Sequence, residues 1–252
     1  MKRLMTVSGI LTTLLLSSLT MLSSLTSLAQ TPSREDLLKE MNAKRAELAA
    51  LEKTFLSPSD EDQATYAEFL RTPNTGLIRL LPRQKFDSDV YKENEKSLVL
   101  RGGGAFYSFT RLTHEYGWGS DLAFDQGQFC VGFAGADYGF LTSLGDIPLE
   151  NVGLETPEAA FFAAYKSARE ESQARTEFRQ LGAGVELEGV QIKSRTPARA
   201  NSTYLLRSIT YLRADVLVAF RVVRIDSDGS AIILWKLLKK FENPNFISRL
   251  NQ

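Results

Sequence analysis

The chain has 252 residues, with 30 basic and 30 acidic side chains, one histidine and one cysteine. This charge balance argues against nucleic acid as a partner, because a sequence-independent nucleic-acid binder needs a clustered cationic surface. One cysteine excludes a disulfide within the chain. One cysteine with one histidine also excludes the common structural zinc sites, so we predict no metal centre of this kind.

The first 29 residues have the layout of a secretory signal peptide. Lys2 and Arg3 precede an uncharged run over 4–33, and Ser27-Leu28-Ala29 places small residues before a cleavage point after residue 29. The run is also long enough to span a bilayer as an uncleaved anchor, but its many serines and threonines favour cleavage. We therefore predict a secreted or periplasmic protein, with contact to a membrane only through the signal segment if it stays uncleaved.

Residues 30–56 are predicted to contain an N-terminal amphipathic helix, from about 34 to 55. Its hydrophobic residues recur at alternating steps of four and three: Leu37, Met41, Leu48, Leu51 and Phe55, interrupted by Lys44. Such spacing suits a short coiled coil, and hence self-association, or packing of the helix on its own domain. Beyond it, Ser57-Pro58-Ser59 and the acidic residues 60–62 predict the start of a second helix.

Residues 57–252 are predicted to form one α+β domain. Alternating β-type runs at 121–125 and 128–134 flank a compact turn, and the runs at 216–225 and 231–238 flank an Asp-Gly turn, which is a strong hairpin signal. Thr156-Pro157-Glu158 predicts the start of a long helix that reaches about residue 181. The expected fold is a mainly antiparallel sheet, or an open barrel, crossed by one long helix and preceded by two N-terminal helices.

The stretch 101–145 is unusually rich in glycine and aromatic residues. It holds ten of the 17 glycines and ten of the 25 aromatic residues, counting 15 Phe, 8 Tyr and 2 Trp. Glycine among large aromatic side chains suggests tight turns and close approach between strands. Cys130 alternates with Phe129 and Val131, so we expect it to be a small buried filler on the opposite strand face.

The chemically richest segment of this stretch is 112–121. The catalytic candidates are His114, Glu115 and Asp121, which could act as acid or base, and the ligand-binding candidates are Tyr116 and Trp118, which could stack on a ligand. The alternative is structural: the aromatic side chains fold back on the core and the histidine makes an internal hydrogen bond. No recognised catalytic spacing is present, which favours the structural interpretation.

No cofactor motif accompanies this segment. The triple glycine at 102–104 lacks the Gly-Lys-Ser or Gly-Lys-Thr of a phosphate loop, no Gly-x-Ser-x-Gly is present, and Asp226-Ser227-Asp228-Gly229 lacks the rest of a calcium loop. We therefore predict no cofactor and favour a non-enzymatic module that binds an unknown ligand or envelope component. The alternatives are a hydrolase that uses His114 with Glu115 or Asp121, and a carrier of an apolar ligand.

Overall fold

The computed structural model describes residues 32–86, 102, 104–114, 116–117, 119–133, 136–187 and 189–246. The chain divides into two compact units, Met1–Ala49 and Ala50–Gln252. The predicted signal peptide at 1–29 lies outside the described residues. No helix in the described ranges combines the length and the apolar character needed to cross a membrane.

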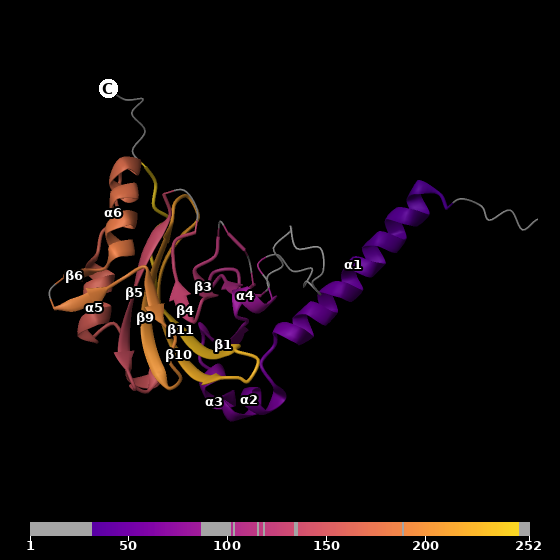
Figure 1. Cartoon of the computed structure of the whole chain (residues 1–252), viewed down its shortest axis with the longest axis horizontal. Helices are drawn as coiled ribbons and strands as arrows, with labels where there is room; N and C mark the ends of the chain where they lie inside the picture. Colours follow the sequence, from indigo (N-terminus) through magenta and orange to yellow (C-terminus); the bar gives the residue numbers. More distant parts are fainter. Residues whose placement is uncertain are drawn as a thin grey trace, which may run out of the picture. The chain divides into compact units, whose positions relative to one another are not determined.

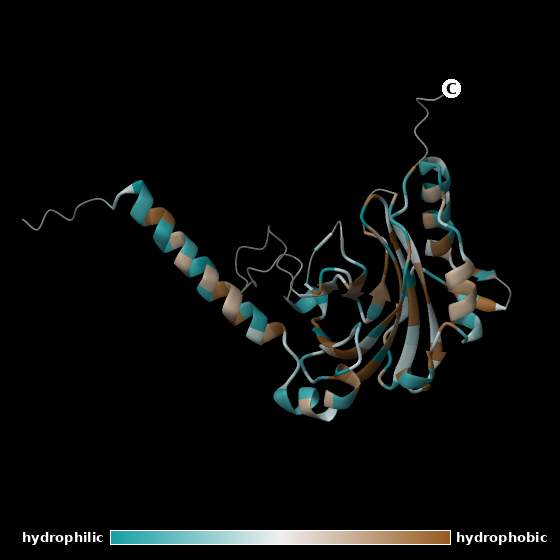
Figure 2. Ribbon diagram, turned by 180° about the vertical axis from the view of Figure 1, so that it is seen from behind, coloured by the Kyte–Doolittle hydropathy of each residue, from teal (hydrophilic) through white to brown (hydrophobic). Residues whose placement is uncertain are grey.

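Helix α1 (Arg34–Leu56) begins in the first unit and confirms the predicted N-terminal helix. Ser33 caps its start, because the Ser33 hydroxyl accepts a hydrogen bond from the Asp36 backbone at 3.1 Å and the Asp36 carboxylate accepts one from the Ser33 backbone. Hydrophobic residues recur along α1 between hydrophilic ones (Figure 2). Leu37 and Leu51 of the predicted stripe are exposed, so self-association through α1 stays a prediction.

The predicted second helix is two short helices, α2 (Asp60–Thr65) and α3 (Ala67–Leu70), which meet at Tyr66. Ser59 and Asp62 form a reciprocal capping box at the start of α2, as its acidic first turn suggested. The short helices α4 (Arg83–Phe86) and η1 (Leu149–Asn151) follow later in the chain.

A five-stranded antiparallel sheet forms the centre of the second unit. Its spatial order is β1 (Thr75–Leu80), β11 (Ala231–Lys240), β10 (Ala214–Ile225), β9 (Ser202–Thr210) and β5 (Tyr138–Gly145). The Asp-Gly turn joins β10 to β11, and Gly229 has a φ of 87°, which glycine adopts without steric cost. This hairpin was predicted and is confirmed.

A second, four-stranded sheet has the order β2 (Phe106–Tyr107), β3 (Leu122–Asp125), β4 (Gln128–Cys130) and β8 (Arg195–Pro197). The hairpin β3–β4 turns at Gln126 and Gly127, both with positive φ, and confirms the pairing expected from the sequence. Strands β6 (Val185–Leu187) and β7 (Val190–Ile192) form a separate two-stranded ribbon.

The layers follow from strand alternation. On β9 and β10, side chains such as Leu206 and Phe220 face the four-stranded sheet, whereas Leu205 and Leu217 face α5 (Pro157–Ala164) and α6 (Glu171–Ala183), which cover the other side (Figure 1). Cys130 is buried on the outer face of the four-stranded sheet, beside small residues and Phe106, as expected for a filler. The α+β fold is confirmed, and the described strands do not close into a barrel.

The prediction of one long helix over 157–181 is wrong in one respect, because residues 165–170 separate α5 from α6. No proline or glycine causes this break. The backbone of Ala168 instead bonds to two buried tyrosines: its N–H donates to the Tyr138 hydroxyl at 3.0 Å, and its carbonyl accepts from the Tyr211 hydroxyl at 2.5 Å. These tertiary hydrogen bonds replace helical ones, so local helix propensity is overridden.

Candidate functional site

The predicted catalytic histidine is held inside the fold. The Nε2 of His114 lies 2.8 Å from the Arg79 backbone carbonyl, and its ring packs edge-on to Tyr107 with the centroids 5.3 Å apart. Burial lowers the pKa of His114 below its ordinary value of 6.5, so the neutral ring donates its proton to that carbonyl. The ring therefore acts as a hydrogen-bond donor to the protein backbone.

Asp121 is also buried, but its hydrogen-bond partners differ from the partner of His114. Its carboxylate accepts hydrogen bonds from the Phe109 backbone N–H at 2.7 Å and from the Ser208 hydroxyl at 2.8 Å. Burial raises the pKa of Asp121 to about 6, although these hydrogen bonds oppose the rise. The carboxylate therefore ties the loop after β2 to strand β9 across the two sheets.

The structure also describes Tyr116, one of the two candidate ligand-binding residues. Tyr116 is partly buried, and its ring forms a T-shaped pair with Phe106 at a centroid distance of 4.8 Å, so the ring packs on the protein itself. Glu115 and Trp118 lie outside the described residues. Burial raises the pKa of the Cys130 thiol to about 11, which leaves it protonated and a poor nucleophile. The positions of His114, Asp121 and Tyr116 favour the structural interpretation of this segment.

A different part of the second unit contains an open cavity, which we call the Arg207 pocket. Its volume is about 520 Å³, within the range of small-molecule sites. It lies between the α5–α6 linker and the chain that follows β11. The lining includes residues 165–169, Arg207, Asp215 and residues 241–245.

The floor of the Arg207 pocket is an ion pair between neighbouring strands. The Arg207 guanidinium on β9 donates two hydrogen bonds to the Asp215 carboxylate on β10, one of them 2.8 Å long, and a third to the Phe162 carbonyl. Both side chains are buried, and the guanidinium carbon lies 3.4 Å from the centre of the Phe241 ring. Burial raises the pKa of the Asp215 carboxyl, and the Arg207 guanidinium opposes that rise.

The rim of the pocket carries positive charge. Lys166 and Arg169 are exposed on the α5–α6 linker, and neither forms an ion pair with another described residue. Among the lining residues, three are cationic (Lys166, Arg169 and Arg207) and two are acidic (Asp215 and Glu242), a surplus of one positive charge. Because Arg207 is neutralised by Asp215, this surplus lies at the opening.

Three tyrosines hold the linker that carries these cations. The Tyr165 hydroxyl donates to the Glu177 carboxylate and lies 2.9 Å from the Tyr138 hydroxyl, while Tyr138 and Tyr211 bond the backbone of Ala168. Burial raises the pKa of both Tyr138 and Tyr165 above the ordinary value, so the phenols stay protonated and serve as hydrogen-bond partners. The linker is thereby fixed in its non-helical course.

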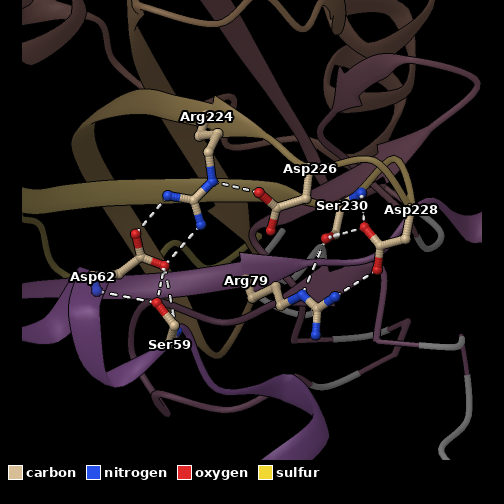
Figure 3. A network of polar contacts seen from close by, with 7 residues as sticks. All are labelled: Ser59, Asp62, Arg79, Arg224, Asp226, Asp228 and Ser230. Carbon is tan, nitrogen blue, oxygen red and sulfur yellow. Dashed lines mark hydrogen bonds and ion pairs between the residues drawn. The ribbon is translucent and has the colours of Figure 1, made fainter.

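A second polar cluster, which shares no residue with the pocket lining, is made of matched charges (Figure 3). Arg224 on β10 donates to both oxygens of Asp62, at 2.6 and 2.9 Å, and also bonds to Asp226. Arg79 on β1 bonds to the Asp228 carboxylate and to the Ser230 hydroxyl. The arginines thus occupy the two carboxylates of the motif that superficially resembled a calcium loop.

This cluster attaches the helix α2 to the central sheet. Hydrogen bonds from Arg224, the largest cause, and from Ser59 lower the pKa of Asp62 to about 2. The arginines and carboxylates of this cluster are already paired with one another, so they leave few charged groups to bind a ligand. Across the described ranges, no group of three or more His, Cys, Asp or Glu side chains is placed to hold a metal ion.

The sequence contains one local signal for the Arg207 pocket. Arg207 interrupts the otherwise apolar β9 run Tyr-Leu-Leu-Arg-Ser-Ile, and Asp215 precedes the apolar β10 run Val-Leu-Val-Ala-Phe. Charged residues in strands of this kind are almost always paired when buried. The position of the linker and of residues 241–245 beside them has no comparable local signal.

Comparisons with protein-family models, with curated proteins and with solved structures found no match to this chain.

Proposed function

We propose that this protein is an exported, non-enzymatic binding module that holds a small anionic molecule in the Arg207 pocket. The observation that carries the proposal is the pair of exposed cations, Lys166 and Arg169, at the opening of a cavity of about 520 Å³ whose internal arginine is already neutralised. Cationic side chains bind carboxylates and phosphates through charge-assisted hydrogen bonds. A ligand with at least one such group and a few polar substituents suits this opening.

The rest of the lining supplies neutral hydrogen-bonding groups. Asn243 and Asn245 are exposed on one side of the opening, and Ser167 is partly exposed on the other. Amide and hydroxyl groups can both donate and accept, so they suit the polar part of an organic acid or a phosphate ester. Phe241 adds one apolar surface beside them.

The other functions that the sequence allows have less support. A carrier of an apolar ligand would need a mainly apolar lining, whereas this lining is rich in charged and amide side chains. A hydrolase centred on His114 would need the ring open to a substrate, whereas the ring packs on Tyr107 and its Nε2 is bonded to the Arg79 carbonyl. Ligand stacking on Tyr116 and Trp118 stays a prediction, because Trp118 is not among the described residues.

The test is a ligand screen on the full chain at fixed ionic strength. Citrate, malonate and glycerol 3-phosphate serve as anionic probes and glycerol as the neutral probe, with the unfolding temperature as the first readout and calorimetry as the second. We expect one or more of the anions to raise the unfolding temperature and to bind saturably, and glycerol to do neither. Lys166→Gln and Arg169→Gln should each weaken that binding by roughly two- to fivefold, as expected for exposed charges.

Two controls separate the pocket from general effects of anions. Lys39→Gln removes one exposed cation from α1 and should leave the affinity unchanged. Excluded anions such as citrate stabilise many proteins without binding, and that stabilisation would persist in the double variant Lys166→Gln with Arg169→Gln. Equal binding by the wild type and the double variant, or no saturable binding of any probe, would rule the proposal out.

A further inference from the structure

The charges that line the Arg207 pocket are of two signs and come from two segments of the chain. Lys166 and Arg169 belong to the α5–α6 linker, whereas Glu242 belongs to the segment that follows β11. All three residues are exposed. Since the ion pair on the floor of the pocket is neutral, the lining is left with two cations on one segment and one carboxylate on the other.

These opposite charges do not neutralise each other. Among the described residues, no ion pair joins Glu242 to Lys166 or to Arg169, and none joins any of the three to another side chain. The neighbouring cation Lys239 does not line the pocket and lies over the Phe241 ring, with its Nζ 4.7 Å from the ring centre. The three exposed charges of the lining are therefore accessible to a ligand.

Tyr211 holds both of these segments in place. Its hydroxyl donates to the Ala168 carbonyl of the linker, and its ring stacks on Phe246 of the other segment, with the centroids 3.8 Å apart. The adjacent Leu212 N–H donates to the Pro244 carbonyl at 2.9 Å. The backbone on both sides of the pocket is thus fixed before a ligand arrives, which reduces the ordering free energy that binding must overcome.

We propose that the Arg207 pocket binds an α-amino acid with an acidic side chain, an inference that rests on the proposed function of the pocket. At neutral pH such a molecule has two carboxylates and one ammonium group. Its carboxylates match Lys166 and Arg169, and its ammonium group matches Glu242, each through charge-assisted hydrogen bonds. Its single net negative charge also complements the surplus of one positive charge in the lining.

The Glu242 carboxylate favours this class over other small acids. A simple dicarboxylate would satisfy Lys166 and Arg169 but would place unbalanced negative charge beside Glu242, and like charges repel. An amino acid with a neutral side chain would use Glu242 but would leave one of the two cations without a partner. Only a ligand with both signs of charge, in this ratio, uses all three side chains.

The experiment compares matched ligands by calorimetry on the full chain, at neutral pH and fixed ionic strength. The probes are L-glutamate and L-aspartate, each beside the dicarboxylate that lacks its ammonium group, glutarate and succinate. For at least one pair, we expect the amino acid to bind roughly two- to fivefold more tightly than the dicarboxylate, the range of one exposed ion pair. L-Glutamine or L-asparagine, without the second carboxylate, should bind more weakly than the acidic amino acid by a similar factor.

Glu242→Gln should remove the preference for the amino acid. It should weaken binding of the amino acid by roughly two- to fivefold and leave the dicarboxylate bound as tightly as before, or more tightly, because a repulsion is lost. A variant that failed to fold would lose both ligands, so unequal responses separate lost recognition from lost folding. Glu68→Gln, at an exposed residue of α3 outside the pocket lining, is the matched control and should change neither affinity.

The outcomes separate this inference from the proposed function. If a dicarboxylate binds saturably and loses affinity in the double variant Lys166→Gln with Arg169→Gln, the anion site stands. The amino-acid inference is then overturned if neither amino acid binds more tightly than its dicarboxylate, or if Glu242→Gln leaves the preference unchanged. If none of these anions, nor any of the earlier anionic probes, binds saturably, the proposed function and this inference fail together.

Discussion

Arg207 and Asp215 form a buried bidentate ion pair between the neighbouring strands β9 and β10, and a third hydrogen bond joins Arg207 to the Phe162 carbonyl of α5. The pair lies on the sheet face that α5 and α6 cover, where most other side chains are apolar. Two opposite charges with their hydrogen bonds satisfied are tolerated there, whereas one alone is costly. The floor of the Arg207 pocket is thus also a point where helix and sheet are joined.

Removing one partner of this pair should destabilise the protein strongly. Asp215→Ala leaves the Arg207 guanidinium buried without a counter-charge, and we expect a loss of about 3–5 kcal/mol in the free energy of unfolding. Urea denaturation followed by circular dichroism measures this loss. The double variant Arg207→Met with Asp215→Leu should recover most of it, because neither charge then remains in the apolar layer.

A second prediction concerns Gly139 of β5, which pairs with Ser208 of β9. A Cβ atom at Gly139 would lie 2.3 Å from the Arg207 backbone oxygen and 2.5 Å from a Val131 methyl carbon. Gly139→Ala should therefore push apart strands β5 and β9 and cost about 2–3 kcal/mol, or more if the register shifts. Thermal or urea unfolding measures the change.

Gly182 of α6 provides the matched control for Gly139. A Cβ atom there would meet nothing closer than the Ser194 hydroxyl at 3.9 Å, and its backbone is helical. Gly182→Ala should stabilise the protein by about 0.5–1 kcal/mol, since alanine loses less backbone entropy in a helix. Equal effects of the two alanine substitutions would contradict the close approach of β5 and β9.

A third prediction concerns acid stability through Asp62. Its pKa is about 2 in the folded protein, below the ordinary 3.8, so its ion pair with Arg224 stabilises the fold above about pH 4. This contribution is lost as the pH falls from about 4 through 2. Arg224 is half exposed and therefore screened by solvent, so we expect Asp62→Asn to cost only about 1–2 kcal/mol at pH 7 and almost nothing near pH 2.

Denaturant unfolding of the wild type and of Asp62→Asn over this pH range measures the difference. Asp60→Asn, in the same first turn of α2 but exposed, should show little of this pH dependence. A difference between Asp62→Asn and the wild type that stayed constant down to pH 2 would show that the capping geometry, and not the charge, accounts for the effect.

Local chemistry predicted the hairpins correctly. Gln126-Gly127 and Asp228-Gly229 both favour a tight turn, because each ends in glycine. Both join paired antiparallel strands, as predicted. The helix start at Ser59 could also be predicted from the sequence, because a capping box depends on residues three apart. Structural features that depend on only a few neighbouring residues could therefore be predicted from the sequence.

Structural features that depend on contacts between residues distant in sequence could not be predicted. Residues 165–170 have ordinary helix-forming character, and only the tyrosines at 138 and 211 on the sheet show why the helix stops there. The candidate site could not be predicted for the same reason. His114 and Asp121 are close in sequence but bond to different parts of the fold, whereas Arg207 and Lys166 are distant in sequence and line one pocket.

The last prediction concerns the pH dependence of stability through Asp121. Burial raises the pKa of this carboxyl to about 6 in the folded protein, above the ordinary 3.8, so its neutral form favours folding. That contribution is complete below about pH 4 and is lost as the pH rises through about 6. Asp121→Asn keeps a neutral side chain of the same shape, so its stability relative to the wild type should improve by roughly 2–3 kcal/mol between pH 4 and pH 7.

Ser208→Ala tests the cause of this dependence. The Ser208 hydroxyl donates to the Asp121 carboxylate at 2.8 Å and lowers its pKa, so removing it should move the loss of stability to higher pH. Urea unfolding of the wild type and both variants from pH 4 to pH 8 measures the three curves. Parallel curves for the wild type and Asp121→Asn would mean that Asp121 is ionised throughout and that the Phe109 N–H and Ser208 already compensate for its burial.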